Sequence, residues 1–259
     1  MSAYDEANKL EIASAMVKEV IEYIEGKKAG HKFIIYADAW YAKAPFTNLI
    51  NAEGRKIGMI CGVRVDAKLR NLPTAYKGKG RKPIYGEVIE IKKLERINIP
   101  GTNYRAAHIK GKARIFGDLE VSIFVTEPKG GGKLRVFIST ADDLLADIDL
   151  SALPIEAEYQ TFLQTHPEFV PLASYKFRWL VEIVYNEQKT YWGMEDYRLR
   201  SENGFTTLVN LHSLLYALLS ILPYLDERFA CLTGLSIQER RDELGKAMTM
   251  KHILGTFVD

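Results

Sequence analysis

The sequence predicts an α/β fold with an all-β stretch inside it, and three observations lead to this prediction. The first 65 residues alternate between helical and strand-like patterns, which is typical of α/β proteins. Residues 66–140 then carry short β-type runs separated by turns, and the remainder is mainly helical. We therefore expect three segments: 1–65 as the first part of the core, 66–140 as an all-β insertion, and 141–259 as a C-terminal helical part.

The elements of the first segment follow from the spacing of apolar residues. Residues 7–26 show helical spacing, and Gly26 marks the expected end of the helix. The apolar run at 33–38 ends in Asp38 and predicts a buried, parallel strand. Residues 45–52 predict a second helix, and residues 57–65 predict a second strand.

Turn residues separate the β-type runs of the second segment. They are Pro100-Gly101, Gly117-Asp118 and the triple glycine Gly130–Gly132, which predicts a hairpin tip. The predicted strands are 85–91, 104–109, 113–116, 119–126 and 134–138.

Two long helices are expected in the third segment, at about 172–190 and 205–222. The second is apolar and long enough to resemble a membrane span. However, Asn210 and His212 lie inside it and Pro223 follows, so we interpret it as a buried core helix.

The cysteines and histidines exclude several classes of site. Cys61 and Cys231 are far apart, and the absence of a CxxC pair argues against a zinc ribbon or a disulfide framework. The five histidines show no metal-ligand spacing. The N-terminus lacks the pattern of a signal peptide, so we expect a cytoplasmic protein that does not enter a membrane.

The positive charge is concentrated in one part of the chain. The net charge is +2, yet residues 64–114 hold 14 Lys or Arg against 4 Asp or Glu. Such a basic block indicates an anionic partner, most often a nucleic acid. Lys79, Arg81 and Lys82 crowd one turn within it and are predicted to contact the DNA backbone. The alternative is an ordinary solvated loop.

Four polar residues share one face of the first long helix: Tyr175, Arg178, Glu182 and Lys189. These four positions fall on one face because an α-helix turns about 100° per residue. A polar stripe on a helix that is otherwise buried needs partners, so it should line a site. The alternative is a solvated face with an ordinary Arg–Glu pair. The other side of the helix is expected to pack into the core through Leu180, Val181, Ile183 and Val184.

The spacing of these residues, Y-x2-R-x3-E-x6-K, resembles the signature around the third catalytic acid of DDE transposases from bacterial insertion sequences. The pair Arg178-Trp179 and the stretch from Gly193 to Ser201 are similar to the residues that accompany this signature. The stretch from Tyr36 to Tyr41 resembles the strand end that carries the second acid. The stretch from Gly80 to Glu87 resembles a conserved turn of the family, which also places an all-β insertion between these two acids.

The resemblance implies a ribonuclease H-like fold and transposition of DNA. Asp38 would be the second acid and Glu182 the third, and together they would bind two Mg²⁺ or Mn²⁺ ions. Tyr175, Arg178 and Lys189 would contact the phosphates of transposon ends. The resemblance also implies a homodimer that acts on paired ends.

One catalytic acid of the family is not found in this sequence. In the family it lies on a strand well before the second acid, but only 37 residues precede Asp38 and they are mostly helical. We therefore expect a fold that is incomplete at the N-terminus and a chain with little or no activity alone, either truncated or half of a split protein. A non-catalytic DNA-binding or regulatory remnant is the alternative. A stand-alone nuclease would need a complete acid set, and Asp38 by itself could be a helix N-cap.

Overall fold

The computed structural model describes residues 6–50, 56–74, 78, 82–194, 196–198 and 201–258. Contacts divide the chain into two compact units, unit 1 from Met1 to Arg178 and unit 2 from Trp179 to Asp259. The predicted boundaries at residues 65 and 140 both lie inside unit 1.

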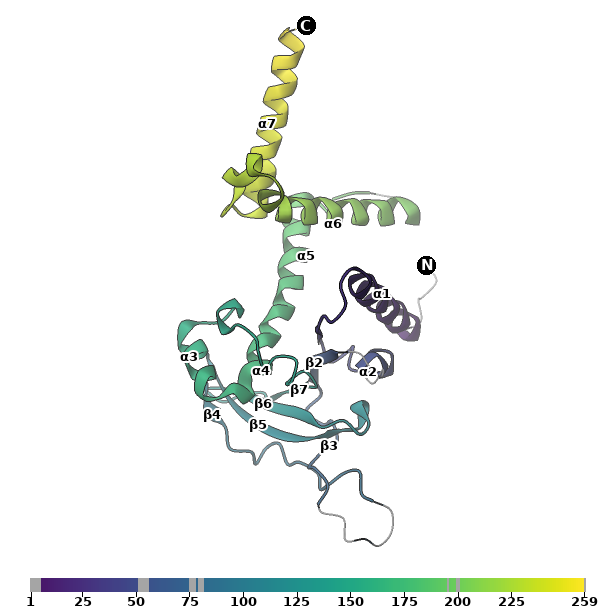
Figure 1. Cartoon of the computed structure of the whole chain (residues 1–259), viewed down its shortest axis with the longest axis vertical. Helices are drawn as coiled ribbons and strands as arrows, with labels where there is room; N and C mark the ends of the chain where they lie inside the picture. Colours follow the sequence, from purple (N-terminus) through teal and green to yellow (C-terminus); the bar gives the residue numbers. More distant parts are fainter. Residues whose placement is uncertain are drawn as a thin grey trace. The chain divides into compact units, whose positions relative to one another are not determined.

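Unit 1 is built on a seven-stranded sheet with the order β1-β2-β7-β6-β5-β3, and β4 also pairs with β5 (Figure 1). β1 and β2 run parallel, as expected, and every other pair is antiparallel. Because β7 pairs with β2, the strands of the predicted insertion extend the same sheet. The bounds are β1 Phe33–Ala37, β2 Ile57–Val63, β3 Leu69–Arg70, β4 Ile97–Asn98, β5 Tyr104–Ala113, β6 Val121–Pro128 and β7 Arg135–Ser139.

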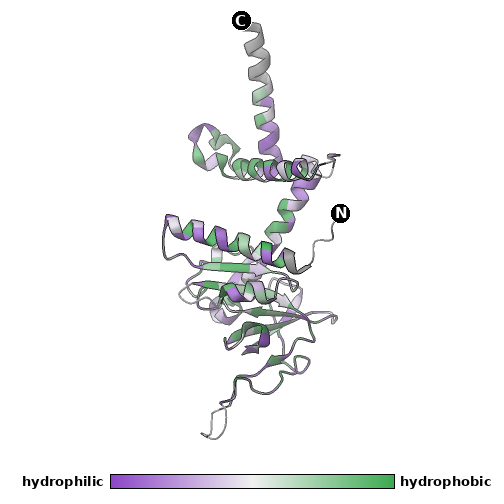
Figure 2. Cartoon of the chain, turned by 90° about the vertical axis from the view of Figure 1, so that its right-hand side faces the viewer, coloured by the Kyte–Doolittle hydropathy of each residue, from purple (hydrophilic) through white to green (hydrophobic). Residues whose placement is uncertain are grey.

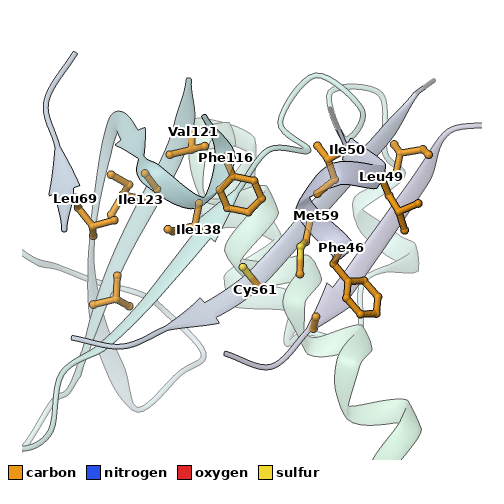
Figure 3. Close-up of a cluster of buried hydrophobic side chains, with 14 of the residues drawn as sticks. Phe46, Leu49, Ile50, Met59, Cys61, Leu69, Phe116, Val121, Ile123 and Ile138 are labelled. Carbon is orange, nitrogen blue, oxygen red and sulfur yellow. The ribbon is translucent and has the colours of Figure 1, made fainter. Parts of the chain in front are cut away.

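Helices cover both faces of this sheet, so the mixed α/β class is confirmed. α1 (Glu6–Lys27) and α2 (Ala44–Ile50) contribute to the core on one face (Figure 3). α3 (Ala157–Thr165) and α4 (Val170–Ser174) contribute to the core on the other. β6 supplies both cores because side chains alternate along a strand: Ile123 lies in the first and Phe124 in the second, each fully buried.

Two of the predicted strands are wrong. Residues 85–91 alternate like a strand but make only one isolated bridge, between Val88 and Arg70. Their partner β3 is only two residues long, so it cannot pair with the whole seven-residue run. Residues 113–116 mostly form the 3₁₀ helix η1 (Arg114–Phe116), which ends at Gly117 with a positive φ of 60°. The other predicted strands of this stretch correspond to β5, β6 and β7, and the triple glycine connects the last two.

Unit 2 consists of α5 (Trp179–Trp192), α6 (Glu202–Leu225), the 3₁₀ helix η5 (Glu227–Leu232) and α7 (Ile237–Val258). Ser201 caps α6 by accepting a hydrogen bond from the Gly204 amide at 3.1 Å. The buried guanidinium of Arg240 on α7 donates to the carbonyl oxygens of Leu219, Ser220 and Leu232 at 3.0–3.1 Å. One side chain of α7 thus satisfies carbonyl groups near the ends of both α6 and η5.

The helices of the third segment differ from the prediction in continuity and in burial. The predicted helix at 172–190 is interrupted by the 3₁₀ helix η4 (Tyr175–Arg178), and α5 begins after it. Leu180, Val181 and Ile183 are 40–56% exposed, so unit 2 alone does not build the core expected on that side.

The expected burial of α6 is also wrong within unit 2. Leu214 is 66% exposed and Tyr224 73%, and hydrophobic residues, drawn in green in Figure 2, recur along the helix. Among the described residues, α6 is the one helix whose length and composition would suffice to cross a membrane, and 11% of its apolar window is buried. A single helix of this kind is weak evidence for a membrane span.

Candidate functional site

Asp38 lies directly after β1, where the sheet runs into a turn. The Tyr41 amide donates to the Asp38 carbonyl at 3.0 Å, which closes this turn, and α2 begins only at Ala44. Asp38 is therefore not the N-cap of α2, and that alternative is wrong. Its side chain is 58% exposed, so the carboxylate is open to solvent and to ligands.

Two residues of the helical signature contact Asp38 across more than 130 positions of sequence. The Tyr175 hydroxyl lies 3.1 Å from the Ala37 carbonyl oxygen and 3.4 Å from Asp38 Oδ1, so it can donate to either. Arg178 Nη1 lies 3.3 Å from Asp38 Oδ1 and 3.5 Å from Oδ2. The guanidinium also lies 5.7 Å from the centre of the Tyr175 ring. The structure thus brings together three of the predicted site residues.

The local backbone explains why Tyr175 and Arg178 point the same way. Both lie in the 3₁₀ helix η4, and side chains three residues apart eclipse one another in a 3₁₀ helix. The Tyr175 ring packs against Phe137 of β7, with ring centroids 5.0 Å apart. The side chain is thereby held between the sheet and the turn after β1.

Burial dominates the electrostatics of Tyr175. It raises the pKa of the phenol to about 12; Arg178 acts in the opposite direction, while Asp38 adds to the rise. The hydroxyl therefore stays protonated at neutral pH and remains a hydrogen-bond donor. Tyr175 is a positioning group for the turn at Asp38 rather than a proton acceptor.

Asp38, Tyr175 and Arg178 line a cleft of about 900 Å³, which we call the Asp38 cleft. Four further basic residues line it, and Asp66 is the second acid of its lining. Asp66 forms a two-pronged ion pair with Arg64 at 2.9 Å, so these two charges largely offset each other. Sequence reasoning missed the other basic residues of the cleft, which come from separate loops and β7: Lys92, Lys133 and Arg135.

The lining of the Asp38 cleft combines one solvent-exposed carboxylate, that of Asp38, with several basic side chains. A carboxylate oxygen such as that of Asp38 is a hard donor of the type that Mg²⁺ and Mn²⁺ prefer. Mg²⁺ is commonly held by one or two carboxylates, with water and substrate phosphates as its other ligands. The basic lining would attract such phosphates. In the described part of the chain, no three His, Cys, Asp or Glu side chains form a cluster that could hold an ion.

Two of the remaining predicted site residues belong to unit 2. Glu182 and Lys189 both lie on α5 of unit 2, seven residues apart and so on one face, where Glu182 is half-buried and Lys189 exposed. The prediction that the carboxylates of Asp38 and Glu182 lie close together concerns both units and stays a prediction. Lys82 is exposed. Lys79 and Arg81 lie outside the described residues.

The comparisons with known proteins leave the function to be argued from these residues. No protein-family model matches the chain, and no curated protein matches it either.

Proposed function

We propose that this chain is part of a DDE-type DNA transposase and supplies two of its metal-binding carboxylates, Asp38 and Glu182. The proposed reaction is a metal-dependent transfer of phosphoryl groups on DNA. The observation that supports it most is the contact of Tyr175 and Arg178 with Asp38. These residues belong to two separate motifs of the resemblance, and an accidental resemblance gives no reason for them to meet.

The order of elements in unit 1 also supports a ribonuclease H-like core. The chain runs α1, β1, α2 and β2, the two strands are parallel, and Asp38 stands at the end of the first. Residues that follow the carboxyl ends of parallel strands are the usual place for a site in α/β proteins. The proposed location is the cytoplasm, where the DNA substrate of a bacterial transposase lies.

Each residue of the Asp38 cleft has a distinct role in this proposal. The bound metal would supply activation of a water or a 3′-hydroxyl and stabilisation of the leaving oxygen. Asp38 would provide oxygen ligands, and Tyr175 would hold the turn that orients this carboxylate. Arg178 offsets the charge of Asp38 and has the planar donor geometry that binds a DNA phosphate. Glu182 would complete the carboxylate pair, and Lys189 would contact a phosphate farther along the DNA.

Binding of Mn²⁺ to the full chain, measured by the loss of the free-ion electron paramagnetic resonance signal with duplex DNA present, tests this function. Asp38→Asn and Glu182→Gln should each weaken binding by more than about tenfold, because each removes a ligand. The matched control is Asp66→Asn, which removes an acid from the same cleft whose carboxylate is already paired with Arg64. The control should bind Mn²⁺ like the unaltered chain.

The same titration distinguishes the transposase from the second candidate function, a non-catalytic DNA-binding remnant. The basic lining of the Asp38 cleft favours DNA binding whether or not chemistry takes place there. If DNA binds equally well with and without Mn²⁺, and neither Asp38→Asn nor Glu182→Gln alters the binding of the ion, the transposase proposal is wrong and the remnant is favoured.

A further inference from the structure

A second basic cavity lies at the β3–β5 side of the sheet in unit 1. It has a volume of about 480 Å³, and none of the described residues that line it also lines the Asp38 cleft. We call it the Arg70 pocket, after the residue on β3. Among the residues that the structure describes, its lining includes three cationic side chains and one tyrosine: Lys68, Arg70, Arg114 and Tyr85.

The backbone around Arg70 is held from both sides. On one side β3 pairs with β5, where Arg70 stands opposite Lys112. On the other side the Asn71 amide donates to the Glu87 carbonyl at 2.8 Å, and the Ile89 amide donates to Leu69 at 3.0 Å. The pocket therefore rests on paired backbone rather than on a free loop.

Close backbone packing contributes to this arrangement. A Cβ atom at Gly111 would lie 2.6 Å from the Arg70 carbonyl oxygen, so only glycine allows β5 to approach so closely. Leu69 is 2% exposed, and side chains alternate along a strand, so Arg70 points to the opposite face. Tyr85 fixes the neighbouring wall, because its hydroxyl donates to the Gly117 carbonyl at 3.4 Å.

The charged side chains in the described lining of the pocket are all positive. Like charges that face each other across an antiparallel pair are destabilising, and Arg70 faces Lys112. The Lys112 ammonium donates to a neutral group, the Asp118 carbonyl oxygen, at 2.9 Å, and no described carboxylate forms an ion pair with it. Within the described ranges, no carboxylate forms an ion pair with Lys68, Arg70 or Arg114. A bound anion would relieve this repulsion.

We propose that the Arg70 pocket binds phosphate groups of the backbone of duplex DNA. Two guanidinium groups and an ammonium are the side chains that bind phosphate best, and arginine does so with paired donors. A polyanion fits better than a single phosphate because the positive charge extends along residues 64–114, well beyond the pocket. DNA as the partner rests on the proposed function, but the pocket itself requires neither a metal nor Asp38.

The test is the affinity of the full chain for a fluorescein-labelled duplex, measured by fluorescence anisotropy without divalent ions at several NaCl concentrations. The double variant Arg70→Gln/Arg114→Gln should bind about tenfold more weakly at low salt, and the slope of log affinity against log salt should shrink by about 2. Arg70→Lys/Arg114→Lys keeps both charges and should retain most of the affinity and the slope. This rescue shows that the loss does not come from misfolding.

The matched control removes two exposed charges elsewhere, with Lys18→Gln/Arg228→Gln, and should change the affinity by less than about twofold. The proposal is overturned if the pocket variant binds DNA like the unaltered chain, or if the control loses as much. It is also overturned if the pocket variant loses only the binding of inorganic phosphate. A failure of the Mn²⁺ titration at Asp38 would not alter these results, so the two proposals can fail separately.

Discussion

Units 1 and 2 differ in what their apolar residues contact. In unit 1 the sheet buries apolar side chains on both faces, with Met59 and Ile60 of β2 fully buried on opposite sides. In unit 2 the helix α6 is rich in apolar residues, yet its side chains Leu214 and Tyr224 are mostly exposed. An apolar pattern in the sequence therefore predicts that a surface is buried, but the pattern does not identify the element or partner that buries it.

This difference matters for the site because the predicted catalytic residues are divided between the units. Asp38, Tyr175 and Arg178 belong to the packed unit, and their contacts are defined there. Glu182 and Lys189 belong to a helix whose apolar side chains are exposed. The contacts of Asp38 are therefore made within unit 1, whereas the pairing of its carboxylate with Glu182 belongs to the proposed function.

The largest expected effect is the loss of stability when a buried side chain of unit 1 is shortened. Ile123→Ala in β6 should lower the free energy of unfolding by about 2–5 kcal/mol, because it leaves a cavity in the core of unit 1. Leu214→Ala on α6 should change it by less than about 0.5 kcal/mol, because that side chain is 66% exposed. Urea unfolding followed by circular dichroism measures both. Equal losses would show that α6 is buried against a partner and would remove the contrast between the units.

A smaller effect concerns the pH dependence of unit 1. His108 stacks on Phe124 with ring centroids 5.0 Å apart, and its Nε2 lies 2.8 Å from Ser122 Oγ. Burial lowers the pKa of the imidazole; Asp142 and Glu168 oppose this shift, and Lys110 adds to it. Below about pH 6.5 the unfolded chain takes up a proton that folded His108 resists, so stability should fall as the pH falls toward the lowered pKa.

The control for this pH effect is His108→Gln, which keeps a polar side chain beside Ser122 but does not titrate. Urea unfolding at pH 7.5 and at pH 5.5 should show a smaller loss of stability for the variant than for the unaltered chain. Equal losses would mean that other groups cause the acid sensitivity and that folding does not change the pKa of His108.

The sequence predicted most of the sheet because its signals are local. The apolar runs at β1, β2, β6 and β7 and the glycine turn at 130–132 needed no knowledge of distant contacts. Residues 85–91 show the limit, because their alternating pattern suits a strand but their partner β3 has only two residues. Strand pairing depends on the sequences of both strands, and the pattern of one segment says nothing about the length of its partner.

The residues of the candidate site that belong to sequence motifs could be predicted. The residues that only folding brings together could not. The spacing of the helical signature predicted Tyr175 and Arg178, the motif around the strand end predicted Asp38, and the structure places the three in contact. The basic lining of the Asp38 cleft was missed because Lys92 and Lys133 come from separate loops. The Arg70 pocket was missed for the same reason, since its cations become neighbours only when β3 pairs with β5.

The proposed function requires the side chains of residues 38 and 182 to converge, and chemical crosslinking can detect this. Asp38→Cys/Glu182→Cys would be treated with a short bifunctional methanethiosulfonate in a chain that also carries Cys231→Ser. Cys61 does not interfere, because it is buried and burial raises the pKa of its thiol to about 12.

The matched control for the crosslink is Asp38→Cys/Val184→Cys, which places the second thiol on the opposite side of the same turn of α5. We predict an intramolecular crosslink for the pair at 38 and 182 and none for the control, detected by the mass of the linked peptides. Absence of the crosslink at 38 and 182, under conditions in which both cysteines react, would show that the two side chains do not converge.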